Sequence, residues 1–82
     1  MNARKTLQLI LSGSKNIRFA DMVRLVEAYG FRLDRVSGSH HIFNRSGIRE
    51  IVNLQNMHGQ AKPYQISQFM KLIETQGLTL ED

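Results

Sequence analysis

The sequence predicts an α+β domain in which helices cover one face of a three-stranded antiparallel sheet. Apolar residues recur at helical spacing near both ends of the 82-residue chain. Apolar and polar residues alternate between glycine turns in the middle. The only proline, Pro63, stands where the last helical pattern begins. A chain of this length builds one modest core, so residues 1–82 are expected to form a single domain.

Two helices are predicted before the strands. Residues 4–11 carry apolar side chains at helical spacing, and the glycine- and serine-rich segment 12–16 interrupts the pattern. Residues 19–29 form the clearest helix, and Gly30 provides its stop. Its apolar stripe has the spacing i, i+3, i+4, i+7 and i+10 and comprises Phe19, Met22, Val23, Val26 and Tyr29.

Three strands are predicted next, over residues 31–37, 40–45 and 48–54, with Gly38-Ser39 and "NRSG" as the turns. Alternation in the first strand is imperfect, because Phe31 and Leu33 would share one face while Val36 would lie on the other. A strand meander of this kind leaves one face open to water when helices cover the other.

The last predicted helix follows a polar loop at residues 55–62. Pro63 occupies the first turn, where a missing N–H costs nothing, and Gly77 ends the helix. The apolar stripe of this helix, which we expect in the core, comprises Ile66, Phe69, Met70 and Ile73.

The charge distribution favours a polyanionic partner. Residues 1–62 hold ten of the eleven Lys and Arg residues and four acidic residues, a net charge of +6, whereas residues 63–82 carry −2. A basic body suits nucleic acid, although a merely solvated basic surface is the simpler alternative. The absence of cysteine points to a reducing cytoplasm. No segment is long enough to span a membrane, and the apolar run at residues 7–11 is too short for a signal peptide.

Two adjacent histidines, His40 and His41, follow the Gly38-Ser39 turn. Neighbouring strand residues point to opposite faces, so His40 shares a face with Ile42 and His41 shares one with Phe43. Phe43 is the better core candidate, and we therefore expect His40 to point outward. Burial of Ile42 instead, or a bulge at the glycine, would reverse this assignment.

An outward histidine can transfer protons near neutral pH, which is what RNA cleavage by the 2′-hydroxyl requires. Arg35 and Arg45 flank the histidines, and Lys62 precedes a helix N-terminus that favours anions. An ordinary strand pair is the simpler reading of two adjacent histidines. A metal site is disfavoured, since adjacent strand histidines point apart and the only other imidazole, His58, falls in a predicted loop.

The segment "GFRLDRVSGSHHIF", a hydrophobic strand, a loop and "KPYQISQFMKLIETQGL" together resemble the HicA toxins of type II toxin–antitoxin modules, over roughly residues 19–78. The resemblance implies a double-stranded-RNA-binding-like α-β-β-β-α fold. It also implies an mRNA interferase that needs no metal or other cofactor, uses a histidine of the "GSH" region and is silenced by a HicB antitoxin covering the active face. On this chain the implied catalytic residues are His40 first and His41 second. Gly38 and Ser39 match the turn of the family's motif, and Lys62 matches its basic position before the last helix. With Arg35 and Arg45, which flank the histidine turn, these are the predicted RNA-binding residues.

The chain departs from the resemblance at its N-terminus. We divide it into a helical extension at residues 1–16, a HicA-like core at 17–78 and a tail at 79–82. The apolar side of the extension must pack on the core or on a partner. We expect a monomeric toxin within a toxin–antitoxin complex. A non-catalytic RNA-binding module is the alternative, and DNA binding by residues 64–75 ranks last because Lys71 is the one cation there.

Overall fold

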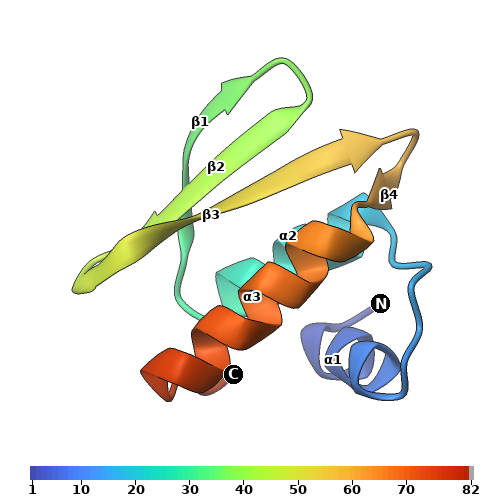
Figure 1. Cartoon of the computed structure of the whole chain (residues 1–82), viewed down its shortest axis with the longest axis horizontal. Helices are drawn as coiled ribbons and strands as arrows, with labels where there is room; N and C mark the ends of the chain where they lie inside the picture. The colour runs from blue at the N-terminus through green and yellow to red at the C-terminus, as the bar shows by residue number, and fades with distance from the viewer. Residues whose placement is uncertain (82) are drawn as a thin grey trace.

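The computed structural model describes residues 1–81 and shows an α+β fold (Figure 1). Its sheet is antiparallel, with the strand order β1-β2-β3-β4. The predicted α-β-β-β-α arrangement with an extra N-terminal helix is confirmed, with one additional short strand. The last residue of the predicted tail, at position 82, lies outside the described residues. The elements in chain order are α1 (Ala3–Leu11), α2 (Phe19–Ala28), β1 (Arg32–Ser37), β2 (His40–Arg45), β3 (Ile48–Met57), β4 (Gln60–Ala61) and α3 (Pro63–Gln76).

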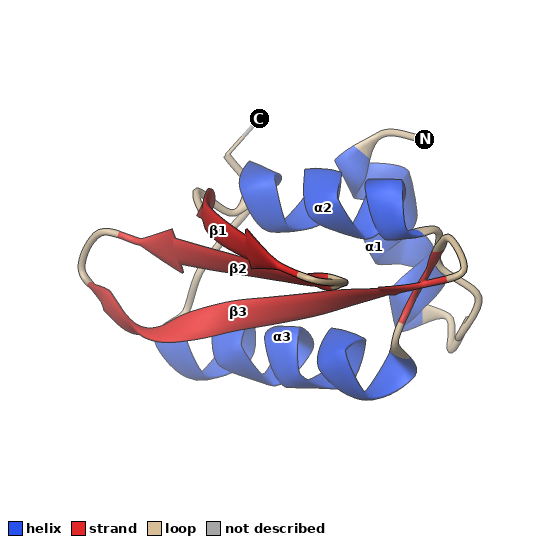
Figure 2. Cartoon of the chain, turned by 90° about the horizontal axis from the view of Figure 1, so that it is seen from above, coloured by secondary structure: helices blue, strands red, loops and turns tan. Residues whose placement is uncertain are grey.

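The helices lie on one side of the sheet. Figure 1 shows α2 and α3 running beneath the strands, with α1 farther from the sheet. In Figure 2, which is seen from above, the strands cross the molecule between α2 and α3, and α1 packs against α2. The opposite face of the sheet carries no helix among the described residues in Figure 1. Within residues 1–81, no helix combines the length and the apolar character that crossing a membrane requires.

The prediction that residues 55–62 form a loop is wrong. Strand β3 continues to Met57, turns at His58-Gly59 and returns as β4. The φ angles of His58 (53°) and Gly59 (85°) are both positive, as a type I′ hairpin turn requires. Residues 55–61 show no alternation of apolar and polar side chains, and within this segment only Ala61 is buried, so the pattern there carries no strand signal.

Strand β1 contains a bulge that explains its imperfect alternation. Leu33 pairs with Phe43 and Val36 pairs with His41, and the register shifts between Leu33 and Arg35. Because an extra residue separates them, Leu33 and Val36 lie on the same face. The prediction that Val36 lies on the opposite face from Leu33 is therefore wrong.

The core lies between the inner face of the sheet and helices α2 and α3. Phe31 and Phe43 are fully buried there, and the ring of Phe69 on α3 contacts Phe31 edge-on at 5.8 Å between centroids. Helix α1 joins this core through Leu7 and Ile10, which are partly buried against it, whereas Leu11 is 70% exposed. The predicted packing of the helix on the chain's own core is therefore found for Leu7 and Ile10.

Both ends of α3 follow the sequence signals. Pro63 occupies the first turn, and Gly77 closes the helix in the left-handed conformation with φ of 64°. The beginning of α3 lies beside β4, next to the end of the sheet that carries the β1–β2 turn (Figure 1). This placement brings Lys62, the residue before the helix, toward the histidine strand.

Candidate active site

His40 lies on the face of the sheet that the helices leave open. In the register it pairs with Gln55 of β3, while Phe43 pairs with Val52 and is 1% exposed in the core. The predicted burial of Phe43 is confirmed, and His40 is half-buried beside polar neighbours. Ile42, on the same face as His40, is also buried at 7%, but it does not belong to the core cluster.

Asn53 contacts the imidazole of His40 from the neighbouring strand. The Nδ1 atom of His40 lies 3.1 Å from Oδ1 of Asn53. An amide oxygen accepts hydrogen bonds, so in this arrangement Nδ1 carries the ring proton of the neutral imidazole. The other ring nitrogen, Nε2, then presents its lone pair, which is the state that a general base needs.

Lys62 reaches the same surface through Gln55. Its ammonium donates to Oε1 of Gln55 at 3.3 Å, and Gln55 is the cross-strand partner of His40. The backbone N–H of Gln55 donates to Oε1 of Gln65 at 2.6 Å, which anchors α3 to β3 at this point. The structure therefore brings His40 and Lys62, which are 22 positions apart in the sequence, to one cluster.

The turn formed by Gly38 and Ser39 ends next to this cluster. Gly38 has φ of 60°, as the first position of a type II′ hairpin requires, and a Cβ there would meet no atom within 4 Å. The carbonyl of Ser39 accepts from the backbone N–H of Asn56 at 2.9 Å. This bond ties the turn to β3 and leaves its outer side accessible.

The two arginines that flank the histidines in sequence lie in different surroundings. Arg35 pairs with Ile42 and is exposed on the His40 face, where its guanidinium bonds Asp34 at 2.6 Å. Arg45 is five residues from His40, about 17 Å along an extended strand. The structure does not bring it to His40, because its guanidinium instead donates to the carbonyl of Tyr29 at 2.6 Å and pairs with Glu81 at 3.5 Å.

His41 points to the helix side, opposite to His40. Its ring contacts Phe19 of α2 edge-on, with 4.7 Å between centroids. The Nδ1 atom of His41 is buried and has no hydrogen-bond partner within residues 1–81. A third imidazole, His58, is exposed at the β3–β4 turn. The part of the chain that the structure describes contains no cluster of three His, Asp or Glu side chains that could hold a metal ion.

A family model described as the HicA toxin of bacterial toxin–antitoxin systems matches residues 19–75, more than half of the chain. The chain belongs to this family. The match begins at the first residue of α2 and ends within α3, so α1 of this HicA toxin lies outside it. Comparisons with curated proteins and with solved structures gave no significant match.

Two residues of the candidate site in this HicA toxin escaped the sequence reasoning. Asn53 and Gln55 are the polar members of β3 that alternate with Val52 and Leu54, which are buried. That alternation is a usable signal, because it places both polar side chains on the outer face. Only the register between β2 and β3 shows that these two side chains lie next to His40.

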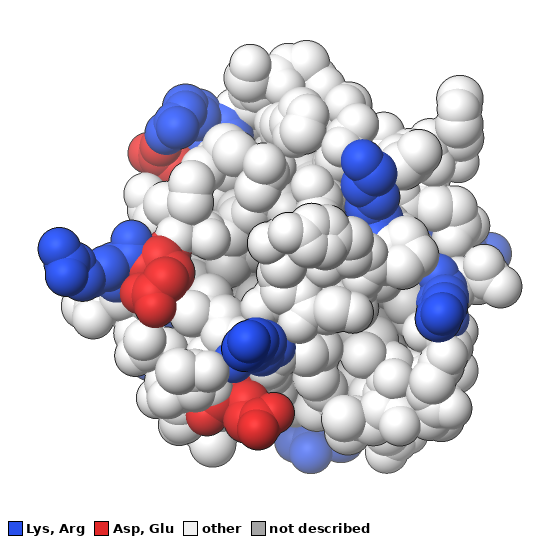
Figure 3. Space-filling model, in the orientation of Figure 1, with Lys and Arg blue, Asp and Glu red and all other residues white. Residues whose placement is uncertain are grey.

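The charges of this HicA toxin are unevenly spread over the face seen in Figure 3. Acidic side chains appear in the left half of that view, next to basic ones. The right half, which carries β4 and the beginning of α3, shows basic side chains alone on the visible surface. The end of the molecule with Lys62 is therefore the more suitable one for a phosphate backbone.

Proposed function

We propose that this HicA toxin is an endoribonuclease that cuts mRNA without a metal ion or other cofactor, with His40 as the proton-transfer residue. The observation that carries the proposal is the pairing of His40 with Asn53 on the open face of the sheet. It supports a ring held through Nδ1 on the open face, and in the neutral form of this ring the lone pair of Nε2 is free to accept a proton.

In the proposed reaction Nε2 of His40 removes the proton from a ribose 2′-hydroxyl. The 2′-oxygen forms a bond to the adjacent phosphorus, and the bond from phosphorus to the 5′-oxygen breaks. Water at the open face protonates the leaving oxygen. The products are a 2′,3′-cyclic phosphate and a 5′-hydroxyl. General base catalysis of this kind accelerates a reaction by roughly 10²–10⁴-fold, so slow turnover is expected.

Lys62 and the Gly38-Ser39 turn are the proposed phosphate contacts nearest to His40. A lysine ammonium stabilises the charge that grows on the phosphoryl oxygens, and the N–H groups of a glycine turn can hold such oxygens. Arg35 lies on the same face and is proposed to contact the backbone farther along. In this scheme His41 keeps β2 packed on α2 through Phe19.

The proposed partner besides RNA is a HicB-like antitoxin in the cytoplasm. Membership of the HicA toxin family supports an antitoxin partner in general. An inhibitor of this enzyme must cover His40 and Lys62 or block the path of the RNA chain between them. We propose that it does so as one antitoxin surface against a monomeric toxin.

The decisive experiment measures cleavage of purified RNA in EDTA by the wild-type protein and by three histidine variants. His40→Ala is expected to lose roughly 10²–10⁴-fold in rate. His58→Ala is the matched control, because it removes an exposed imidazole from the β3–β4 turn, and it should cleave like the wild type.

The outcomes separate the alternatives. If His40→Ala and His41→Ala both cleave at the wild-type rate, the assignment of the histidine strand is wrong. Loss of wild-type activity on chelation would revive a metal-dependent mechanism. Binding of RNA without any cleavage would favour a non-catalytic RNA-binding module, which would use the same cationic surface.

A further inference from the structure

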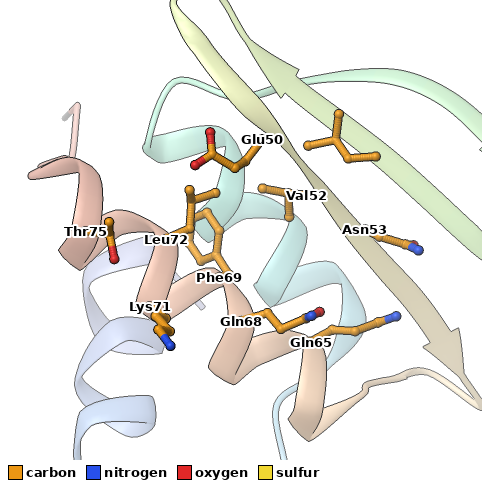
Figure 4. Close-up of a pocket in the computed structure, with 10 residues that line it drawn as sticks. Glu50, Val52, Asn53, Gln65, Gln68, Phe69, Lys71, Leu72 and Thr75 are labelled. Atoms are coloured by element: carbon orange, nitrogen blue, oxygen red, sulfur yellow. The ribbon is translucent and has the colours of Figure 1, made fainter.

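A groove runs between β3 and α3, beside the candidate site (Figure 4). Its volume is about 510 Å³, within the range of small-molecule sites in proteins. The apolar part is formed by Val52, Leu72 and Phe69. Three carboxamides, Asn53, Gln65 and Gln68, also line the groove. Figure 4 shows the two glutamines extending from α3 toward β3.

The groove is continuous with the candidate site through Asn53. This residue lines the groove and at the same time contacts Nδ1 of His40 at 3.1 Å. Gln65, another lining residue, binds the backbone of Gln55, which pairs with His40. An RNA chain that places a ribose at His40 therefore passes the mouth of the groove with its neighbouring nucleotide.

The lining suits a nucleobase. A base has a flat apolar face and an edge on which donors and acceptors stand side by side, and carboxamides carry the same combination. Oε1 of Gln65 is occupied by the N–H of Gln55 at 2.6 Å, which directs the amide and keeps its NH₂ group as a donor. Gln68 is held by a bond from its Nε2 to the Tyr64 hydroxyl at 3.0 Å, so its Oε1 serves as an acceptor.

We propose that this groove is a subsite for one unpaired nucleobase next to the phosphodiester that is cut. The substrate would then be single-stranded RNA, and cleavage would depend on the identity of one nucleotide. This inference rests on the proposed endoribonuclease function and adds the substrate form and the source of sequence preference.

An added strand from a protein partner is the competing occupant, because β3 has a free edge before Asn56. The structure favours the base. The outward N–H of Gln55 already donates to the side chain of Gln65 on α3. A partner strand that paired along this edge would either miss a hydrogen bond at Gln55 or break the bond that holds α3 to β3. Uncharged carboxamides beside the half-buried His40 also fit a base edge better than a peptide backbone.

The test uses a pool of randomised single-stranded RNA and sequences the cleavage sites of the wild type, Gln68→Leu and Gln8→Leu. Gln68→Leu keeps the side-chain volume and removes both hydrogen-bonding groups from the groove. Gln8→Leu makes the same change on exposed α1 and serves as the control. We expect a nucleotide preference at one position beside the cut for the wild type and the control, and at least a fivefold weaker preference for Gln68→Leu.

A second measurement separates this inference from the proposed function. The His40→Ala protein is used to select RNA from the same pool by binding, with and without Gln68→Leu. A preference that depends on Gln68 in this selection supports the subsite even if the wild type fails to cleave, which would defeat the proposed function alone. An unchanged preference in both measurements overturns the subsite. Preferential binding of duplex RNA over single-stranded RNA would also overturn the subsite.

Discussion

Asn53 holds the imidazole of His40 from the adjacent strand, with 3.1 Å between Oδ1 and Nδ1. The two side chains come from β2 and β3, whose register is set by the burial of Phe43 and Val52 on the other face. The packing of the core therefore decides which side chain orients the histidine. This link makes the proton-transfer role of His40 testable through its neighbour.

Substitution of Asn53 should change the activity in two distinguishable ways. Asn53→Ala removes one hydrogen bond and should lower the cleavage rate by about tenfold or less, the equivalent of 0.5–1.5 kcal/mol. Asn53→Asp places a carboxylate beside the ring, favours the charged imidazolium and should move the rising limb of the rate–pH profile to higher pH by about one unit. Profiles that coincide for all three proteins would refute the orienting role.

Lys62 should contribute one phosphate contact. For a single-stranded RNA, loss of one contact reduces the slope of log affinity against log salt concentration by about 0.7. We expect Lys62→Gln to show this smaller slope and weaker binding in titrations at several salt concentrations. Lys5→Gln, on exposed α1, is the matched control and should keep the wild-type slope. A wild-type slope for Lys62→Gln would remove the residue from the RNA surface.

Helix α1 should be part of the folding unit. Leu7 packs against the core, whereas Leu11 on the same helix is 70% exposed. Leu7→Ala should lower the free energy of unfolding by about 1–2 kcal/mol, less than the 2–5 kcal/mol typical of fully buried positions. Leu11→Ala should change it by less than about 0.5 kcal/mol. Equal urea midpoints for the two variants would show that α1 detaches before the core unfolds.

Tyr29 should make the fold sensitive to alkaline pH. It is 4% exposed, and burial raises the pKa of its phenol above the ordinary value of 10.0. The folded state thus prefers the neutral phenol, while the unfolded chain ionises at the ordinary pKa. The stability that the folded protein gains from neutral Tyr29 is fully present below the ordinary pKa of tyrosine. It is lost as the pH rises through the raised pKa of the folded state.

The alkaline loss is measured by urea unfolding at about pH 8 and about pH 10.5, around the ordinary tyrosine pKa. Tyr29→Phe should lose less stability between the two pH values than the wild type does. Tyr64→Phe is the control, because it removes the same hydroxyl from a tyrosine that is 65% exposed in the folded state. If Tyr29→Phe loses as much stability as the wild type, other groups account for the alkaline sensitivity.

The elements that the sequence predicted well are those with a local physical cause. The stripe of α2 appears as buried Phe19, Met22 and Val26, because helical periodicity places them on one face whatever they pack against. Pro63 and Gly77 bound α3 through their own backbone restrictions. Strand β4 and the bulge in β1 escaped prediction, since both depend on pairing with a neighbouring strand.

For the candidate site, the sequence by itself determined that one of two adjacent imidazoles faces outward, because strand side chains alternate and Phe43 must be buried. Only the tertiary structure decided what surrounds that imidazole. The strand register put Asn53 and Gln55 beside His40, the docking of α3 brought Lys62 to it, and five residues of extended strand kept Arg45 away. Alternation acts between neighbouring residues, whereas these contacts depend on how separate elements pack across the sheet.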